Sequence, residues 1–146
     1  MRMDMNITAY RRKINYYETD CMQIVHHSNY IRFFEEARID FLEQIGVNYA
    51  EIEKMGYVIP VLSVSAEYKS MATFGETVAI TVKFEEFSGI RFAFTYQVID
   101  IATGTLRATG KTTHCYLKDG KPVNLKRQLP EYYASMTSQV GWESSF

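Results

Sequence analysis

The sequence lacks most features that are typical of secreted proteins, membrane-spanning proteins and small domains stabilised by a bound metal. It contains only two cysteines, Cys21 and Cys115, which lie far apart and form no C-x-x-C pair. This spacing supports neither a disulfide framework nor a zinc finger, and a reducing compartment fits it better. Residues 1–10 contain charged and polar side chains and no apolar run, so neither a signal peptide nor a transmembrane helix is predicted. We expect a soluble, cytoplasmic protein that does not bind a membrane.

An excess of charge of one sign is also missing. The 16 lysine and arginine residues nearly balance the 17 aspartate and glutamate residues, which gives a formal net charge of −1. No overall field would attract nucleic acid, so we expect no nucleic-acid partner, and an anionic ligand must meet a local basic patch. The 146 residues are enough for one domain with a real core. We expect a single domain over residues 1–146, with a core at about 8–130 and a tail at 131–146.

One segment has the pattern of an amphipathic helix. From Tyr30 to Gly46, apolar residues recur at intervals of three and four, and charged residues occupy the other side. Ser28 and Asn29 precede this run as candidate N-caps, and Gly46 follows it as a candidate terminator. The sequence therefore predicts one long helix. Its apolar stripe consists of Tyr30, Phe33, Phe34, Ala37, Phe41, Leu42 and Ile45.

Alternation of apolar and polar residues predicts strands before and after this helix. An early strand is expected near Thr8–Tyr16, and a longer stretch of alternation begins after Pro60. The turn-forming pairs Ser88-Gly89, Thr103-Gly104 and Asp119-Gly120 separate or close the later runs. The predicted strands after the helix cover Leu62–Lys69, Val78–Phe84, Phe92–Val98 and Thr105–Leu117.

These elements predict the α+β class, with a curved antiparallel sheet wrapped around the long helix. Short turns make consecutive strands antiparallel neighbours, and a single helix has one apolar stripe to bury. The other face of the sheet would carry small or polar residues such as Ser63, Thr81 and Thr109, and water or a second subunit must cover it. The final stretch, Pro130–Phe146, is expected to begin as a short helix and then to fray.

The loop between the first strand and the helix, residues 16–30, is dense in functional side chains. It contains Asp20, Cys21, Gln23, His26 and His27. Loops that rigid elements hold in place often carry chemistry. An aspartate at this place can equally serve turn formation, and composition by itself favours that role.

The run from Tyr17 to Arg38, YETDxMxxVHHSNYxRxFEEAR, resembles the signature segment of the 4-hydroxybenzoyl-CoA thioesterase family, which consists of hotdog-fold acyl-CoA hydrolases. The resemblance covers about residues 8–130, and so long an ordered segment is more specific than a short pattern. It continues at Tyr68-Lys69, Phe74-Gly75-Glu76, Gly89-Ile90-Arg91-Phe92 and Thr103-Gly104.

The resemblance implies a hotdog sheet and a homo-oligomer, either a dimer that joins two sheets edge to edge or a tetramer, with the active site at the subunit interface. It implies an acyl-CoA substrate and no cofactor. Asp20 occupies the position of the family's catalytic aspartate, and His27 occupies the position whose backbone N–H points at the thioester carbonyl. The candidate substrate-binding residues are Gln23, Val25, Lys69 and Arg91. Three basic residues at or near strand ends, Lys69, Arg91 and Lys111, are the candidates for binding the CoA phosphates.

Elementary chemistry supports such an arrangement. The first N–H groups of a helix have no partner within the helix, and the helix dipole adds partial positive charge there. A developing oxyanion is stabilised at such a place, and removing one donor of this kind costs about 3–4 kcal/mol of transition-state stabilisation. The Asp20 carboxylate can attack the thioester to give an anhydride or take a proton from an attacking water. The sequence leaves both roles open.

The histidines carry separate expectations. His26 and His27 are adjacent, so their side chains point in different directions and only one is expected to reach the site. By family position this is His27, although capping and packing at the helix start explain it equally well. His26 is expected to be structural, and His114, in an alternating strand, is expected to be a core residue. Gln23 departs from the family pattern, because relatives usually have glycine there.

Other motifs fail on spacing. The run Gly104–Thr112 ends in Gly-Lys-Thr, but five residues separate its glycines where a Walker P-loop needs four. G-x-S-x-G is absent, and Asp20, His27 and His114 form no recognised metal-binding pattern, so we expect no metal. Two rivals to a thioesterase stay open: a hotdog dehydratase that acts on acyl thioesters, and a non-catalytic domain that binds an acyl group or another small ligand.

Overall fold

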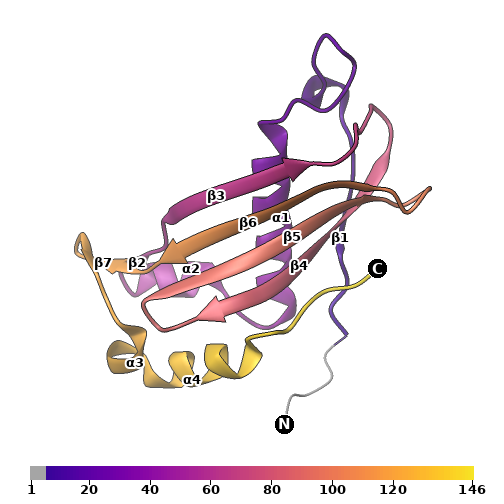
Figure 1. The fold of residues 1–146 in the computed structure, drawn as a ribbon. Helices are drawn as coiled ribbons and strands as arrows, with labels where there is room; N and C mark the ends of the chain where they lie inside the picture. Colours follow the sequence, from indigo (N-terminus) through magenta and orange to yellow (C-terminus); the bar gives the residue numbers. More distant parts are fainter. Residues whose placement is uncertain (1–5) are drawn as a thin grey trace.

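The computed structural model describes residues 6–146, and its main layer is a five-stranded antiparallel sheet. Helix α1 (Asn29–Gln44) lies across one face of this sheet (Figure 1). The predicted α+β class, a curved sheet around one long helix, is confirmed. In spatial order the strands are β1 (Tyr10–Lys13), β4 (Thr77–Phe87), β5 (Arg91–Asp100), β6 (Leu106–Cys115) and β3 (Val61–Tyr68).

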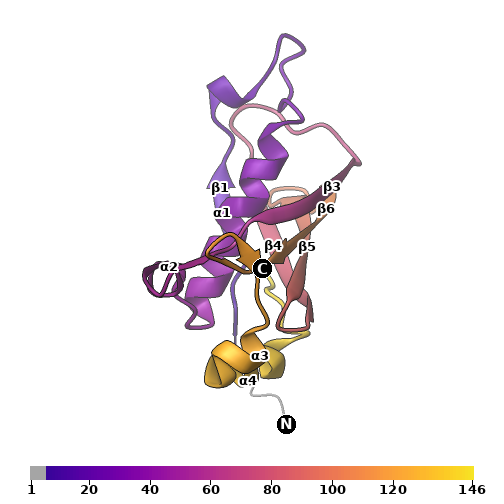
Figure 2. The same cartoon turned by 90° about the vertical axis from the view of Figure 1, so that its left-hand side faces the viewer.

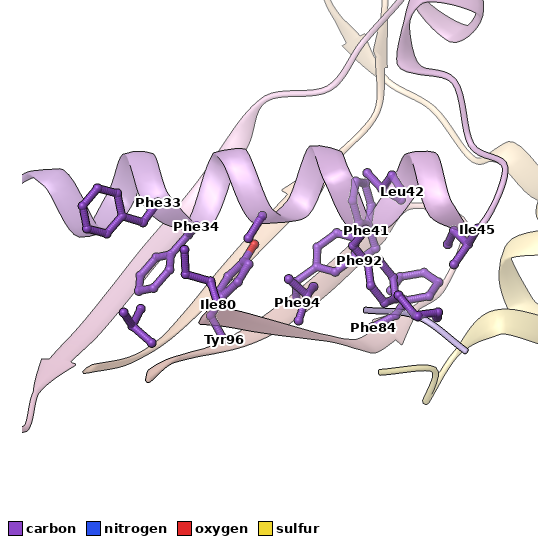
Figure 3. Packing of buried hydrophobic residues seen from close by; sticks show 14 of the residues in the cluster. Phe33, Phe34, Phe41, Leu42, Ile45, Ile80, Phe84, Phe92, Phe94 and Tyr96 are labelled. Atoms are coloured by element: carbon purple, nitrogen blue, oxygen red, sulfur yellow. The ribbon is translucent and has the colours of Figure 1, made fainter. Parts of the chain in front are cut away.

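The hydrophobic core fills the space between α1 and the sheet (Figure 3). All seven residues of the predicted helix stripe are buried, each with at most 6% of its surface exposed. Burial of one such phenylalanine contributes roughly 1.5–3 kcal/mol, so this stripe is what attaches the helix to the sheet. The predicted terminator is also confirmed: Gly46 has φ +85°, and beyond the helix end the Val47 N–H donates to the Leu42 carbonyl over 2.8 Å.

The order of the strands differs from what short turns predict. The hairpins β4–β5 and β5–β6 form at Gly89 and Gly104, which have φ +89° and +73°. Strand β3, however, pairs with β6 at the edge of the sheet and not with β4, the next strand in the chain. The connection between β3 and β4 is too long for a tight hairpin and crosses the end of the sheet, where the Gly75 N–H donates to the Ile14 carbonyl.

Two of the predicted strands are longer than those observed. The early strand ends at Lys13, because the Glu18 carboxylate accepts the Asn15 N–H and a 3-10 turn, η1 (Tyr16–Glu18), follows. The late strand breaks after Cys115, and the chain continues in a second small sheet. That sheet consists of β2 (Tyr57–Val58), β7 (Leu117–Lys118) and β8 (Lys121–Pro122); three short helices complete the fold, α2 (Tyr49–Lys54), α3 (Leu125–Gln128) and α4 (Pro130–Gln139).

The chain after α4 packs onto the sheet and does not fray. The Phe84 N–H donates to the Trp142 carbonyl and the Ser144 N–H donates to the Val82 carbonyl, each over 2.9 Å. These bonds extend the β1 side of strand β4, and burial of Trp142 at 9% exposure adds apolar contact that the sequence did not predict.

The molecule has two different ends. The loop before α1 and the β3–β4 connection lie at one end, and α3 and α4 lie at the other (Figures 1 and 2). No helix in residues 6–146 covers the outer face of the sheet (Figure 2), and none there is long and apolar enough to cross a membrane. Gly110 lies within β6, where a Cβ would overlap the Phe34 ring, so the Gly-Lys-Thr run belongs to a packed strand.

Candidate active site

Asp20 begins a four-residue turn ahead of helix α1. The Asp20 N–H donates to the Ile24 carbonyl and the Gln23 N–H donates to the Asp20 carbonyl, each over 2.9 Å. Thr19 and Val25 pair across the base of this turn, and the β3–β4 connection bridges to its second arm. The turn is therefore held from two sides although it has little regular structure.

The Asp20 carboxylate is half-buried and only partly engaged. Its Oδ1 accepts the Met22 N–H over 2.8 Å, which is the turn-forming contact expected of an aspartate at this place. The two functions considered for Asp20 are thus compatible, because one oxygen holds the turn while the side chain lines two neighbouring hollows.

The first hollow, here called the helix-side hollow, lies between the Asp20 turn, the start of α1 and the end of β3. It has a volume of about 390 Å³, and its floor consists of buried side chains. Burial raises the pKa of Tyr30 to about 12, so its phenol keeps its proton at neutral pH. The hollow is lined by Asp20, Met22, Ile24, Val25, His27, Tyr30, Tyr68, Lys69, Ser70, Met71 and Ala72.

The second hollow, here called the loop-side hollow, lies on the other side of the Asp20 turn and has a volume of about 600 Å³. The rings of Tyr16 and Phe74 meet edge to face at 5.6 Å and form one wall. Both rings are more than half exposed, so this hollow is open to solvent. Its lining residues are Tyr16, Thr19, Asp20, Met22, Gln23, Ile24, Thr73 and Phe74.

The start of α1 presents a free donor next to the helix-side hollow. Within residues 6–146 the His27 N–H has no hydrogen-bond acceptor, whereas the Ser28 N–H donates to His26 Nδ1 over 3.2 Å. The 16-residue helix adds the positive end of its dipole at this point. His27 and Asp20 line the same hollow, which therefore borders both a carboxyl group and the electropositive start of α1.

The rings of His26 and His27 lie side by side, with centroids 4.1 Å apart, so the prediction that they point in different directions is wrong. Their other contacts differ. His26 Nδ1 also lies 2.8 Å from Ser28 Oγ, which supports the predicted structural role of His26 at the helix start. The ring of His27 meets Tyr68 edge to face at 6.4 Å and lines the helix-side hollow. His114 lies in the core with 1% exposure and bonds to Thr112 over 2.8 Å, so its predicted core position is confirmed and it is remote from Asp20.

A buried ion pair supports the loop from below. Arg12 Nη1 donates to Glu18 Oε1 over 2.7 Å, and Arg12 Nε donates to Glu36 Oε1 over 2.8 Å. Burial by itself raises the pKa of Glu18, but the hydrogen bonds from Arg12 and the Asn15 N–H outweigh it and hold this pKa below its ordinary value. The Asn29 side chain then donates to the Glu18 carbonyl, which ties the loop to α1. Sequence reasoning missed this role of Glu18, although its place two residues before Asp20 was visible.

Gln23 adopts a backbone conformation that favours glycine. Its φ is +65°, in the left-handed region where a residue with a Cβ pays on the order of 1 kcal/mol. Glycine would adopt this conformation without that cost, so Gln23 keeps the shape of the turn at a cost.

The candidate substrate-binding residues are not all brought together. Val25 is buried and lines the helix-side hollow. Lys69 lies at its mouth, with Nζ 2.8 Å from the exposed Glu67 carboxylate. Arg91 lines neither hollow: it begins β5, roughly 30 Å along the strand from Asp100 at the site end. Lys111 lies in β6 with Nζ 3.9 Å from Glu86, also away from both hollows.

Residues of one long segment match a known family. The model of the thioesterase-like superfamily covers residues 14–132, which include the Asp20 turn, α1 and the whole sheet after β1. The chain belongs to the thioesterase-like superfamily. A DHNA-CoA thioesterase from Staphylococcus aureus has a similar structure, with a TM-score of 0.84 and 30% sequence identity over 89% of this chain and 88% of that chain.

Two further similar proteins match this chain over nearly their whole length. The crystal structure of a hypothetical protein, AQ1494, from Aquifex aeolicus has a TM-score of 0.76 and 38% identity, over 84% of this chain and 95% of that one. The acyl-CoA thioester hydrolase YbgC of Escherichia coli O6:H1 is 26% identical over 132 residues, which are 87% of this chain and 94% of that protein. The prediction of a hotdog-fold thioester hydrolase is confirmed.

Residues 6–146 contain no group of three histidine, cysteine, aspartate or glutamate side chains arranged to hold a metal ion.

Proposed function

We propose that this thioesterase hydrolyses acyl-CoA to a free acid and CoA, with Asp20 as the catalytic carboxylate. One observation carries the proposal: Asp20 and His27, whose N–H has no acceptor among residues 6–146, border the same apolar hollow at the start of α1. We also propose, as the sequence predicts, that the protein is cytoplasmic and that its substrate is an acyl-CoA.

The reaction requires few groups. The Asp20 carboxylate takes a proton from water while the hydroxyl attacks the carbonyl carbon, or it attacks that carbon itself to give an anhydride that water then opens. In both routes the carbonyl oxygen gains negative charge, which the His27 N–H and the dipole of α1 stabilise. Collapse of the tetrahedral species breaks the carbon–sulfur bond, and the thiolate leaves and takes up a proton.

A thiol-release assay across aliphatic and aromatic acyl-CoAs tests this function. Asp20→Asn keeps an acceptor for the Met22 N–H but removes the charge, so we expect kcat to fall by about 10²–10⁴-fold in a folded protein. His27→Ala keeps the backbone donor, and we expect a loss of less than about tenfold. Hydration of enoyl-CoA without thiol release would indicate a dehydratase instead. Thermal stabilisation by acyl-CoA with no turnover at all would indicate a binding protein.

We infer that two copies of the chain join at strand β3. Within residues 6–146 this strand pairs only with β6, so its other edge offers free N–H and C=O groups. The apolar side chains on it are exposed: Val61, Leu62, Val64 and Tyr68. A second copy pairing through the same strand would satisfy both features, and because Tyr68 also lines the helix-side hollow, the site would border the interface.

The molar mass in solution tests this assembly. We expect the 17.0 kDa chain to sediment as a dimer or tetramer, and Leu62→Lys to shift it toward the monomer. Ile90→Lys is the matched control, because Ile90 is similarly exposed at 43% against 47% for Leu62 but lies in the β4–β5 hairpin. Equal behaviour of the two variants would count against the β3 interface.

A further inference from the structure

Gln23 brings a free amide to the loop-side hollow. Neither its side-chain oxygen nor its nitrogen has a hydrogen-bond partner among residues 6–146. The two threonine hydroxyl groups of this hollow are already used: Thr19 Oγ1 donates to the Tyr16 carbonyl and Thr73 Oγ1 donates to Glu76 Oε2, each over 2.7 Å. The Gln23 amide can therefore both donate to and accept from a bound molecule.

The backbone at Gln23 adds an independent reason to look for a function of this side chain. At φ +65° glycine would relieve strain, and the residue carries a long polar side chain instead. Strained residues persist where the side chain serves a purpose, and they cluster beside active sites. Gln23 is three residues from Asp20 and closes the same turn.

The two hollows differ in a way that assigns parts of a thioester to them. The floor of the helix-side hollow is buried, with 5%, 3% and 1% exposure for Val25, Tyr30 and Ala72. The walls of the loop-side hollow are exposed, with 78% and 52% for Tyr16 and Phe74. An acyl group gains most from the buried floor. The thiol-bearing arm must run out toward solvent, because it continues into a nucleotide or a carrier protein.

We propose that the Gln23 amide binds an amide of the pantetheine arm, which CoA and acyl carrier protein share, in the loop-side hollow. This inference rests on the proposed thioesterase function. The arm alternates amides with short methylene segments, so a free amide beside the aromatic wall of Tyr16 and Phe74 matches both its polar and its apolar parts. Gln23 is thus a binding residue for the carrier and not for the acyl group.

Thioesters that share one acyl group but differ in the thiol test this assignment. The acyl group is joined to CoA, to pantetheine, to acyl carrier protein and to ethanethiol, which has no amide. In Gln23→Gly we expect the ratio of kcat/KM for the pantetheine ester to that for the ethanethiol ester to fall about five- to tenfold, as for one lost hydrogen bond. The CoA and carrier-protein esters should lose the same factor, because the arm is common to them.

Gln23→Asn is the matched control, since asparagine keeps an amide and tolerates positive φ. Its ratio should lie between those of the wild type and Gln23→Gly, while the melting temperature of Gln23→Gly should not fall. An unchanged ratio in Gln23→Gly would overturn the proposal. So would an equal loss with the ethanethiol ester, which would make Gln23 a residue that only shapes the Asp20 turn.

A binding measurement separates this proposal from the proposed reaction. An S-alkyl pantetheine thioether cannot be hydrolysed, and its Kd by calorimetry should rise about five- to tenfold in Gln23→Gly. If the wild type releases no thiol from any ester yet shows this difference in Kd, the hydrolytic function fails and the Gln23 contact stands. If turnover is present and the Kd is unchanged, the Gln23 contact fails alone.

Discussion

The polar side chains under the middle of α1 and those at its start differ in where their hydrogen bonds go. In the core, Arg38 Nη1 donates to the Tyr96 hydroxyl over 3.1 Å, and Thr112 Oγ1 lies 2.6 Å from the same hydroxyl and 2.8 Å from His114 Nε2. At the helix start, the Gln23 amide and the His27 N–H have no partner in the described chain and border open hollows.

This difference follows from solvent access. A buried polar group usually finds a partner inside the protein, because losing water without replacing its hydrogen bond costs about 1–3 kcal/mol. Arg38 Nε is an exception, since it is buried without a partner among the described residues. An exposed group bears no such cost, because water satisfies its hydrogen bonds until a ligand binds. We therefore interpret the core cluster as a stabilising network. We interpret the helix start as a binding surface, supported by the buried Arg12–Glu18 pair.

The largest expected effect concerns that support. Glu18→Gln should lower the free energy of unfolding by about 3 kcal/mol, because it leaves the Arg12 guanidinium without its buried carboxylate. Glu36→Gln is the control: the Glu36 side chain is 36% exposed against 5% for Glu18, and we expect a loss below about 1 kcal/mol. Urea unfolding measures both, and similar losses would mean that the buried pair does not anchor the site end.

A second change alters the core and leaves the site end untouched. Gly110→Ala should destabilise the protein by about 2 kcal/mol, because the new Cβ displaces the Phe34 ring, which stacks on Tyr96 at 4.6 Å. Thr109→Ala, at the neighbouring half-buried position, should cost less than about 0.5 kcal/mol. Thermal unfolding provides the comparison. A loss of thiol release at temperatures where Gly110→Ala is fully folded would contradict the separation of the two regions.

The smallest expected effect is a dependence of the free energy of unfolding on pH that arises from a core residue. Burial, and then the charge of Arg38, lower the pKa of His114 from 6.5 to about 3. Below about pH 6.5 the unfolded chain binds a proton at this histidine that the folded chain does not. The free energy of unfolding therefore decreases as the pH is lowered, by at most about 1.4 kcal/mol per pH unit. His114→Phe should remove this part of the slope.

The difference in slope between the wild type and His114→Phe, from urea unfolding between about pH 5 and pH 6.5, measures the His114 contribution. The pKa of Glu18 is held below its ordinary value of 4.5, so the stability that Glu18 contributes is present throughout this range and is lost only at lower pH. An equal slope in the wild type and in His114→Phe would contradict this prediction. It would mean either that the folded His114 is protonated or that another group causes the pH dependence.

Local patterns predicted a large part of this molecule. The stripe of α1 was predictable because a 3.6-residue repeat has one way to be buried, and Gly46, Gly89 and Gly104 were predictable as turns because their positive φ favours glycine. Asp20 and His27 were predicted as a pair through the ordered motif that contains both, and they do line one hollow. The Arg91 candidate shows the limit of that approach, because a position in a motif does not give a position in space.

By itself the sequence determined the period of each element, the places where the chain turns, and which loop holds the carboxylate. Only the tertiary structure decided that β3 lies beside β6, that the last residues pair with β4, and that Arg38 lies in the core. The physical reason is the range of the interactions: helix stripes and tight turns depend on residues a few positions apart, whereas strand order and buried networks depend on which distant segments exclude water together.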